Sequence, residues 1–155
     1  MQQETNYITE KQTFELQGRT FQEHLCQIIL DDSTFAGVIS EVLDLNFLDV
    51  KYLRVFTSKI FEYRKKYTTH PTRETIAIIV RSEIEKEDDL IKKQVREYLA
   101  RIESGSFSNE GEQHIKDVAL DFCKKQKLKE ALIKSVDLIK SSSFDDKTKV
   151  FSFEK

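Results

Sequence analysis

Residues 20–72 read TFQEHLCQIILDDSTFAGVISEVLDLNFLDVKYLRVFTSKIFEYRKKYTTHPT, and their apolar side chains recur at intervals of three and four. This is the spacing of one face of an α-helix. The stretch predicts three helices, divided at Asp31-Asp32 and at a short link over residues 44–47. Pro71 marks the end of the third helix, because proline disfavours helix at the residue before it. The predicted apolar faces are Phe21, Leu25, Ile28 and Ile29, then Phe35, Val38, Ile39, Val42 and Leu43, and finally Val50, Leu53, Phe56, Ile60, Tyr63 and Tyr67.

Polar residues stand at the predicted helix starts, where their side chains can cap backbone amides. Thr20 and Glu23 have the spacing of a capping box, and Ser33 and Thr72 are the predicted caps of the second and fourth helices. The fourth helix directs Ile76, Ile79, Val80 and Ile84 inward, although its β-branched stretch is also compatible with a short strand. A fifth helix is predicted from about Asp88, with Leu90, Ile91, Val95, Tyr98, Leu99 and Ile102 on its inner face.

A loop over residues 104–111 precedes one long predicted helix over residues 112–140. A helix of about 28 residues is about 40 Å long, which is too long to hide its apolar side against a small domain. We therefore expect that side to contact another long helix, from this chain or from another copy. The predicted contact residues are Ile115, Val118, Phe122, Leu132, Val136 and Ile139, and Leu128 lies on the same side.

The predicted fold class is all-α. Four glycines and one proline are too few for the turns of a sandwich or barrel. Residues 20–104 are predicted to form a globular head of about five helices. Residues 1–19 are polar and weakly patterned, so a loosely ordered arm is expected there, with Phe14 and Leu16 as candidate anchors to the head.

The sequence lacks the motifs of common catalytic and nucleotide-binding sites. It contains no GxxxxGK[ST], GxGxxG, GxSxG or HExxH. His24, Cys26, His114 and Cys123 are residue types that bind zinc. Helical positions two apart point to different faces, however, so these four are interpreted as core and surface residues. We expect no catalytic, cofactor-binding or metal-binding residue in this chain.

The formal charge of −2 argues against a dedicated nucleic-acid-binding domain, which is normally basic. The lysine cluster Lys124, Lys125, Lys127 and Lys129 is either a contact patch for phosphate or an acidic partner, or a solvated helix face. Most aromatic residues lie on the predicted core faces, so no stacking platform for single-stranded DNA is predicted. Two widely spaced cysteines, no secretory signal and no apolar run of membrane-spanning length indicate a cytoplasmic protein without membrane contact.

The order of features over residues 20–80 is specific. A helix with Glu, Leu and an aliphatic run ending in Asp is followed by a helix with an aromatic residue near its start. A link with Phe, a basic-aromatic helix with a Val-Phe pair and a proline come next. The residues are Glu23, Leu25, Ile28 to Asp32, Phe35, Phe47, Lys51 to Phe56 and Pro71. This order resembles the N-terminal domain of DnaB-type replicative DNA helicases, particularly those of bacteriophages, and residues 114–142 resemble the first helix of that family's helical hairpin.

The resemblance implies an assembly role. In the family, head and hairpin form a collar over a hexameric motor, hairpins pair between subunits, and the collar binds primase. This implies self-association, as a dimer or as a hexamer of the full-length protein, and contact with primase or a helicase loader. DNA is reached only through the full assembly. ATP hydrolysis with Mg²⁺ and translocation belong to a C-terminal domain that these 155 residues lack, and residues 105–155 correspond to a linker and the first helix of a truncated hairpin.

Two other interpretations remain open. A free-standing all-helical adaptor or regulator, for example of a phage, would bind a protein through its long helix, with Phe151 and Phe153 as the closing anchors of the domain. The helicase interpretation instead requires a reading frame that continues past Lys155 into a phosphate-binding loop. A helical DNA-binding domain would need a basic recognition helix, for which residues 124–134 are the one candidate, and the overall charge disfavours it.

We predict that this chain alone does not bind or hydrolyse ATP, because it has no loop whose backbone amides could hold the phosphates. A phosphate-release assay on the purified chain tests this. Saturable turnover that co-purifies with the protein would contradict it.

Overall fold

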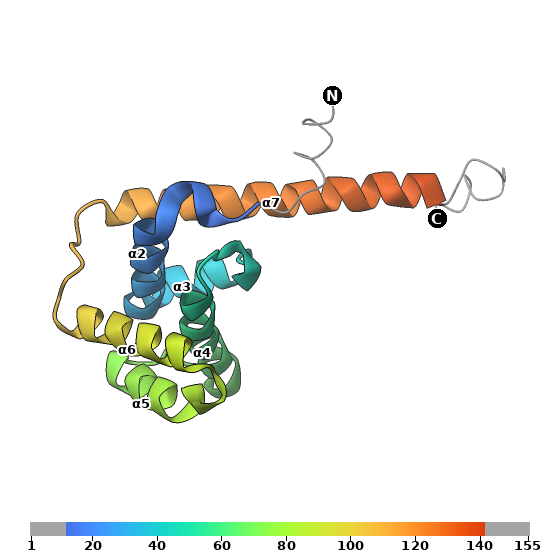
Figure 1. Cartoon of the computed structure of the whole chain (residues 1–155). Helices are drawn as coiled ribbons and strands as arrows, with labels where there is room; N and C mark the ends of the chain where they lie inside the picture. Colours follow the sequence, from blue (N-terminus) through green and yellow to red (C-terminus); the bar gives the residue numbers. More distant parts are fainter. Residues whose placement is uncertain (1–11, 142–155) are drawn as a thin grey trace. The chain divides into compact units, whose positions relative to one another are not determined.

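The computed structural model describes residues 12–141, and every regular element among them is a helix (Figure 1), which confirms the all-α prediction. The stretch over 76–80 is helical, so the alternative of a short strand is wrong. Residues 1–11 of the predicted arm, and residues 142–155, lie outside the described residues. The elements are η1 (Phe14–Gln17), α2 (Gly18–Asp31), α3 (Ser33–Ser40), η2 (Leu45–Phe47), α4 (Lys51–Tyr67), α5 (Arg73–Glu83), η3 (Ile84–Lys86), α6 (Asp89–Glu103) and α7 (Glu112–Ser141).

The described chain divides into two compact units. The first runs from Gln12 to Cys123, and the second contains residues 124–141. Helix α7 begins in the first unit and ends in the second. The first unit is longer at both ends than the head predicted over 20–104, since it includes η1 and the first part of α7.

Helix α2 is the centre of the first unit. It packs against η1, α3 and α4, and α4 in turn packs against α5 and α6. Both apolar and polar side chains of α2 are buried, so this helix has almost no solvent face over its second half. The buried residues of α2 are Gln22, Glu23, Leu25, Cys26, Gln27, Ile28, Ile29 and Leu30.

The segment before α2 is part of the core. Phe14 is fully buried and its ring centroid lies 5.7 Å from that of Phe21, 6.4 Å from Phe47 and 4.5 Å from Phe122. The prediction that Phe14 anchors this segment is therefore confirmed. Leu16 is 91% exposed, so its anchoring role was wrong.

The predicted N-terminal cap of α5 is confirmed, whereas the predicted caps of α2 and α3 are wrong. Thr72 caps α5 as predicted, its side chain accepting from the Thr75 amide. The capping box at Thr20 is wrong, because α2 already starts at Gly18, whose φ of 86° follows η1. Ser33 does not cap α3 either: the carboxylate of Asp32, one residue earlier, accepts from the Phe35 amide at 2.9 Å.

The predicted apolar faces are only partly buried. On α4, Leu53, Phe56 and Ile60 are fully buried, whereas Tyr67 is 53% exposed. Val38 and Leu90, also predicted to face inward, are 48% and 62% exposed. Periodicity locates a helix face but carries no information on which segments cover it.

Phe56→Ala should lower the free energy of unfolding by about 3–5 kcal/mol, because it leaves a cavity in the core. Phe56 is fully buried and meets Tyr98 edge to face at 5.0 Å. Urea unfolding measures the change, and Leu90→Ala, at a 62% exposed residue, is the matched control with an effect of about 0.5 kcal/mol or less. A Phe56→Ala protein as stable as the control would contradict this packing.

Candidate functional site

The first part of α7, residues 112–123, packs into the core of the first unit. Ile115, Ala119 and Cys123 are buried on successive turns, and Val118 is half-buried. Phe122 contacts Phe14, and its ring centroid lies 5.5 Å from that of Phe47. Of the predicted contact residues, Phe122 is therefore covered by Phe14 of η1 and Phe47 of η2, Ile115 is buried and Val118 is half-buried.

An ion pair holds this part of α7 to the start of α3. Lys116 Nζ lies 2.6 Å from Asp32 Oδ2 and 3.4 Å from Glu112 Oε1, and 5.7 Å from the centre of the Phe35 ring. The hydrogen bond from Lys116 and the bond from the Phe35 amide lower the pKa of the Asp32 carboxyl below its usual value. Asp32 therefore has two roles: its carboxylate caps the N-terminus of α3, and it holds the first part of α7 against α3.

The second part of α7, residues 124–141, carries an exposed apolar row. Leu128, Leu132 and Val136 are 60%, 57% and 48% exposed and follow one another at intervals of four residues. Residues at this interval lie above one another on a helix, so the three side chains form one ridge. Ile139 is 45% exposed and falls within the same sector. The predicted contact residues Leu132, Val136 and Ile139 are thus at the surface of this unit.

The four lysines of the predicted basic cluster do not share one helix face. Lys125 and Lys129 are four residues apart and lie on one side of α7, while Lys124 and Lys127 fall on another. Lys124, Lys125 and Lys127 are exposed and Lys129 is half-buried. The four lysines thus occupy more than one side of α7, and their role as a contact patch stays a prediction.

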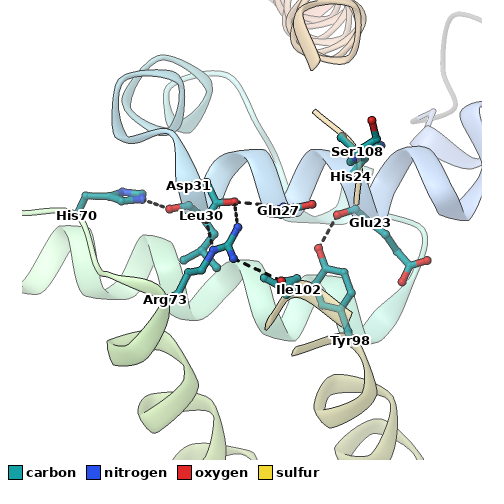
Figure 2. A network of polar contacts seen from close by, with 10 residues as sticks. All are labelled: Glu23, His24, Gln27, Leu30, Asp31, His70, Arg73, Tyr98, Ile102 and Ser108. Carbon is teal, nitrogen blue, oxygen red and sulfur yellow. Dashed lines mark hydrogen bonds and ion pairs between the residues drawn. The ribbon is translucent and has the colours of Figure 1, made fainter. Parts of the chain in front are cut away.

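A polar network, missed in the sequence, closes the C-terminal end of α2 (Figure 2). Arg73 holds the Asp31 carboxylate with two hydrogen bonds of 2.7 and 2.6 Å. Arg73 Nη1 also reaches the Ile102 carbonyl at 3.4 Å, and His70 Nε2 lies 2.6 Å from the Leu30 carbonyl. The last carbonyls of a helix lack partners within the helix. Arg73 and His70 supply those partners for α2 and α6, which fixes where α5 begins.

In the first half of α2, polar groups form contacts with α6 and with the loop before α7. Glu23 forms an ion pair with Arg101, and its backbone carbonyl accepts a hydrogen bond from the buried Tyr98 hydroxyl at 2.5 Å. His24 Nε2 lies 2.8 Å from the Ser108 carbonyl (Figure 2), which attaches the loop before α7 to α2. These pairs stabilise the fold and bring no nucleophile and base together.

The two cysteines are in inert surroundings. Cys26 Sγ accepts a hydrogen bond from Thr57 at 3.1 Å, and burial raises the pKa of its thiol to about 12. Burial, with the nearby charge of Asp44, raises the pKa of Cys123 to about 12 as well. Within residues 12–141, no group of three or more His, Cys, Asp or Glu side chains is arranged to bind a metal ion. No helix in this range combines the length and apolar character needed to cross a membrane.

Comparisons with known proteins give no match: no family model, no curated protein and no solved structure is similar to this chain. The candidate site therefore rests on the geometry of the chain itself. Its strongest feature is the exposed row of Leu128, Leu132 and Val136 on the second part of α7.

Asp32→Asn should lower stability at pH 7 by about 0.5–1 kcal/mol, because asparagine still caps α3 but no longer pairs with Lys116. The pKa of Asp32 is lower in the folded chain than in the unfolded chain, so its contribution is full above about pH 4 and is lost as the pH falls below that value. Urea unfolding at pH 7 and pH 3 should show a smaller difference between wild type and variant at pH 3. Asp137→Asn, at an exposed residue of α7, is the control. If the difference in unfolding free energy between wild type and Asp32→Asn is the same at pH 7 and pH 3, the ion pair of Asp32 with Lys116 does not stabilise the fold.

Proposed function

We propose that this chain is an assembly domain that associates with further copies of itself through the second part of α7. The observation that carries the proposal is the ridge of Leu128, Leu132 and Val136, each about half exposed or more. Exposed apolar side chains that line up over several turns mark surfaces used for association.

The division of α7 supports an intermolecular role for this ridge. The apolar residues of its first part are already covered within the first unit, whereas those of its second part are not. A partner with the same ridge can cover it in a symmetric, two-fold arrangement, which is the commonest architecture of soluble oligomers. Lys124 and Lys127 are exposed outside the sector of the ridge, so their charged ends can stay solvated in such a contact.

The order of residues over 20–143 supports a more specific form of the proposal. It resembles the N-terminal collar domain of DnaB-type replicative helicases, in which the hairpin helices pair between subunits. On this proposal, the domain joins subunits of a hexameric helicase and contacts primase or a loader. ATP hydrolysis and DNA translocation are then the work of a motor domain that follows it.

Val136→Glu should dissociate the assembly, because it places an unpaired carboxylate in the contact. We expect micromolar self-association of wild type, about 8 kcal/mol, and an affinity at least about 100-fold weaker for the variant. Sedimentation equilibrium over a range of concentrations measures both. Leu90→Glu is the matched control, since it adds the same charge at a 62% exposed apolar residue of α6.

If wild type and Val136→Glu are both monomers at hundreds of micromolar, α7 is not an association element in this chain. Equal weakening by Leu90→Glu would show that net charge, not the ridge, controls association. Circular dichroism of each variant verifies that α7 stays helical.

A further inference from the structure

A polar depression lies where α3 begins and α4 ends. Its volume is about 510 Å³, and the residues that line it are Ser33, Thr34, Arg64, Thr68, Thr69 and His70. All of these side chains carry hydroxyl or nitrogen groups, and Ser33, Thr34, Thr68 and Thr69 are exposed. The hydroxyls of Ser33, Thr34 and Thr69 form no hydrogen bond within residues 12–141. The depression therefore offers several donors to a ligand and few apolar contacts.

Arg64 gives this depression a positive charge that no carboxylate within residues 12–141 pairs with. Its Nη1 donates to His70 Nδ1 at 2.8 Å and to the Ser33 carbonyl at 3.4 Å, and both acceptors are neutral. A guanidinium only donates, so His70 Nδ1 accepts and the His70 proton sits on Nε2, facing the Leu30 carbonyl. Among residues 12–141, none of the ion pairs involves Arg64.

The position of the guanidinium is fixed from two sides. Arg64 Nη2 lies against Gly37, where a Cβ atom would approach it to 3.1 Å, so glycine leaves it room beside α3. The acidic residues that directly precede Ser33, Asp31 and Asp32, are already paired with Arg73 and Lys116. Glu62, two residues before Arg64 on α4, is paired with Lys59 at 3.5 Å. An anion in the depression would therefore contact Arg64 and hydroxyl donors, and it would not be repelled by an unpaired carboxylate of these acidic residues.

Two tyrosines extend this surface along α4. The Tyr63 and Tyr67 rings contact each other at a tilt of 44° with centroids 4.6 Å apart, and Tyr67 is 53% exposed. At about 100° per residue, Tyr63, Tyr67 and Arg64 follow one another around less than half of α4, and Thr68 directly follows the last residue of this helix. Lys66 Nζ lies 5.3 Å from the centre of the Tyr67 ring, and Lys65 is exposed nearby. An aromatic face thus adjoins an unpaired cation and a group of hydroxyls.

We propose that this Arg64–Tyr67 surface, made of Tyr63, Arg64, Tyr67 and Thr69, binds single-stranded nucleic acid. One backbone phosphate occupies the depression beside Arg64, and the adjacent base stacks on Tyr67. Arginine and hydroxyl donors suit phosphate oxygens, and a base stacked on an exposed aromatic ring contributes affinity without sequence preference. An acidic peptide would use Arg64 but has no planar ring for Tyr67. The site lies within the first unit and does not depend on association through α7.

Fluorescence anisotropy of a short labelled oligothymidylate on the full chain tests the proposal. We expect binding in the range of 10⁻⁴ M or tighter at about 50 mM salt, with affinity falling as salt rises. Tyr67→Ala should weaken it about 5- to 100-fold, and Arg64→Gln should reduce the slope of log K against log salt by about 0.7, the value for one phosphate on a single strand. Thr69→Val, which removes a hydroxyl without a partner in the described chain, should weaken binding while leaving the fold intact.

Matched probes and variants make each outcome decisive. Lys93→Gln removes one exposed charge from α6, and Leu90→Ala removes one exposed apolar side chain there. Both should leave binding unchanged, and an abasic strand should bind more weakly than oligothymidylate.

The proposal is overturned by an absence of binding at about 1 mM protein, by losses in the controls as large as in Tyr67→Ala and Arg64→Gln, or by an abasic strand that binds equally well. Tighter binding of a labelled polyglutamate peptide would assign the surface to an acidic protein partner instead. Circular dichroism identifies any variant that has lost the fold. If Arg64→Gln has lost it, the proposal is tested by Tyr67→Ala, which keeps Arg64 and its contacts.

Discussion

The burial of α2 is the constraint on which the first unit depends. A helix enclosed by its neighbours is stabilised when the polar side chains that it buries are paired, because an unpaired group costs about 1–3 kcal/mol. Among the described residues of α2, Gln27 Oε1 is the exception. Gln22 bonds to the carbonyls of Phe14 and Gly18 and accepts from the Asp49 amide at 2.8 Å. It therefore supplies the start of α4, which has no side-chain cap of its own, with a hydrogen-bond acceptor.

The other partners of α2 come from the far end of the unit. Arg101 and Tyr98 of α6 meet Glu23, and Arg73 at the start of α5 meets Asp31. These contacts connect residues between 42 and 78 positions apart in the sequence. One central helix thus sets the places of η1, α4, α5 and α6 through directional bonds, while the apolar core supplies most of the driving force.

Helix positions were predictable from sequence, whereas the extent of the core was not. Apolar spacing located α2, α4, α6 and α7 because it reflects local geometry. Tyr67 and Leu16 were misplaced, since their burial depends on which distant segments cover them. The predicted contact residues of α7 divide for a similar reason: Phe14 and Phe47 cover Phe122, whereas Leu132 is 57% exposed. The depression at Arg64 brings together residues from two helices and the turn after Thr68, so no motif along the chain indicates it.

The inert thiols have a practical consequence for measuring how this protein opens. Cys26 lies at the centre of α2 and Cys123 at the last position of α7 within the first unit, and both are fully buried. Thiolate, the reactive form, is scarce at neutral pH when the pKa is about 12. Alkylation of each cysteine in the native protein therefore proceeds through opened molecules only. Its rate at Cys26 reports on exposure of the centre of the core, and its rate at Cys123 reports on the release of α7, so one reagent distinguishes local from global unfolding.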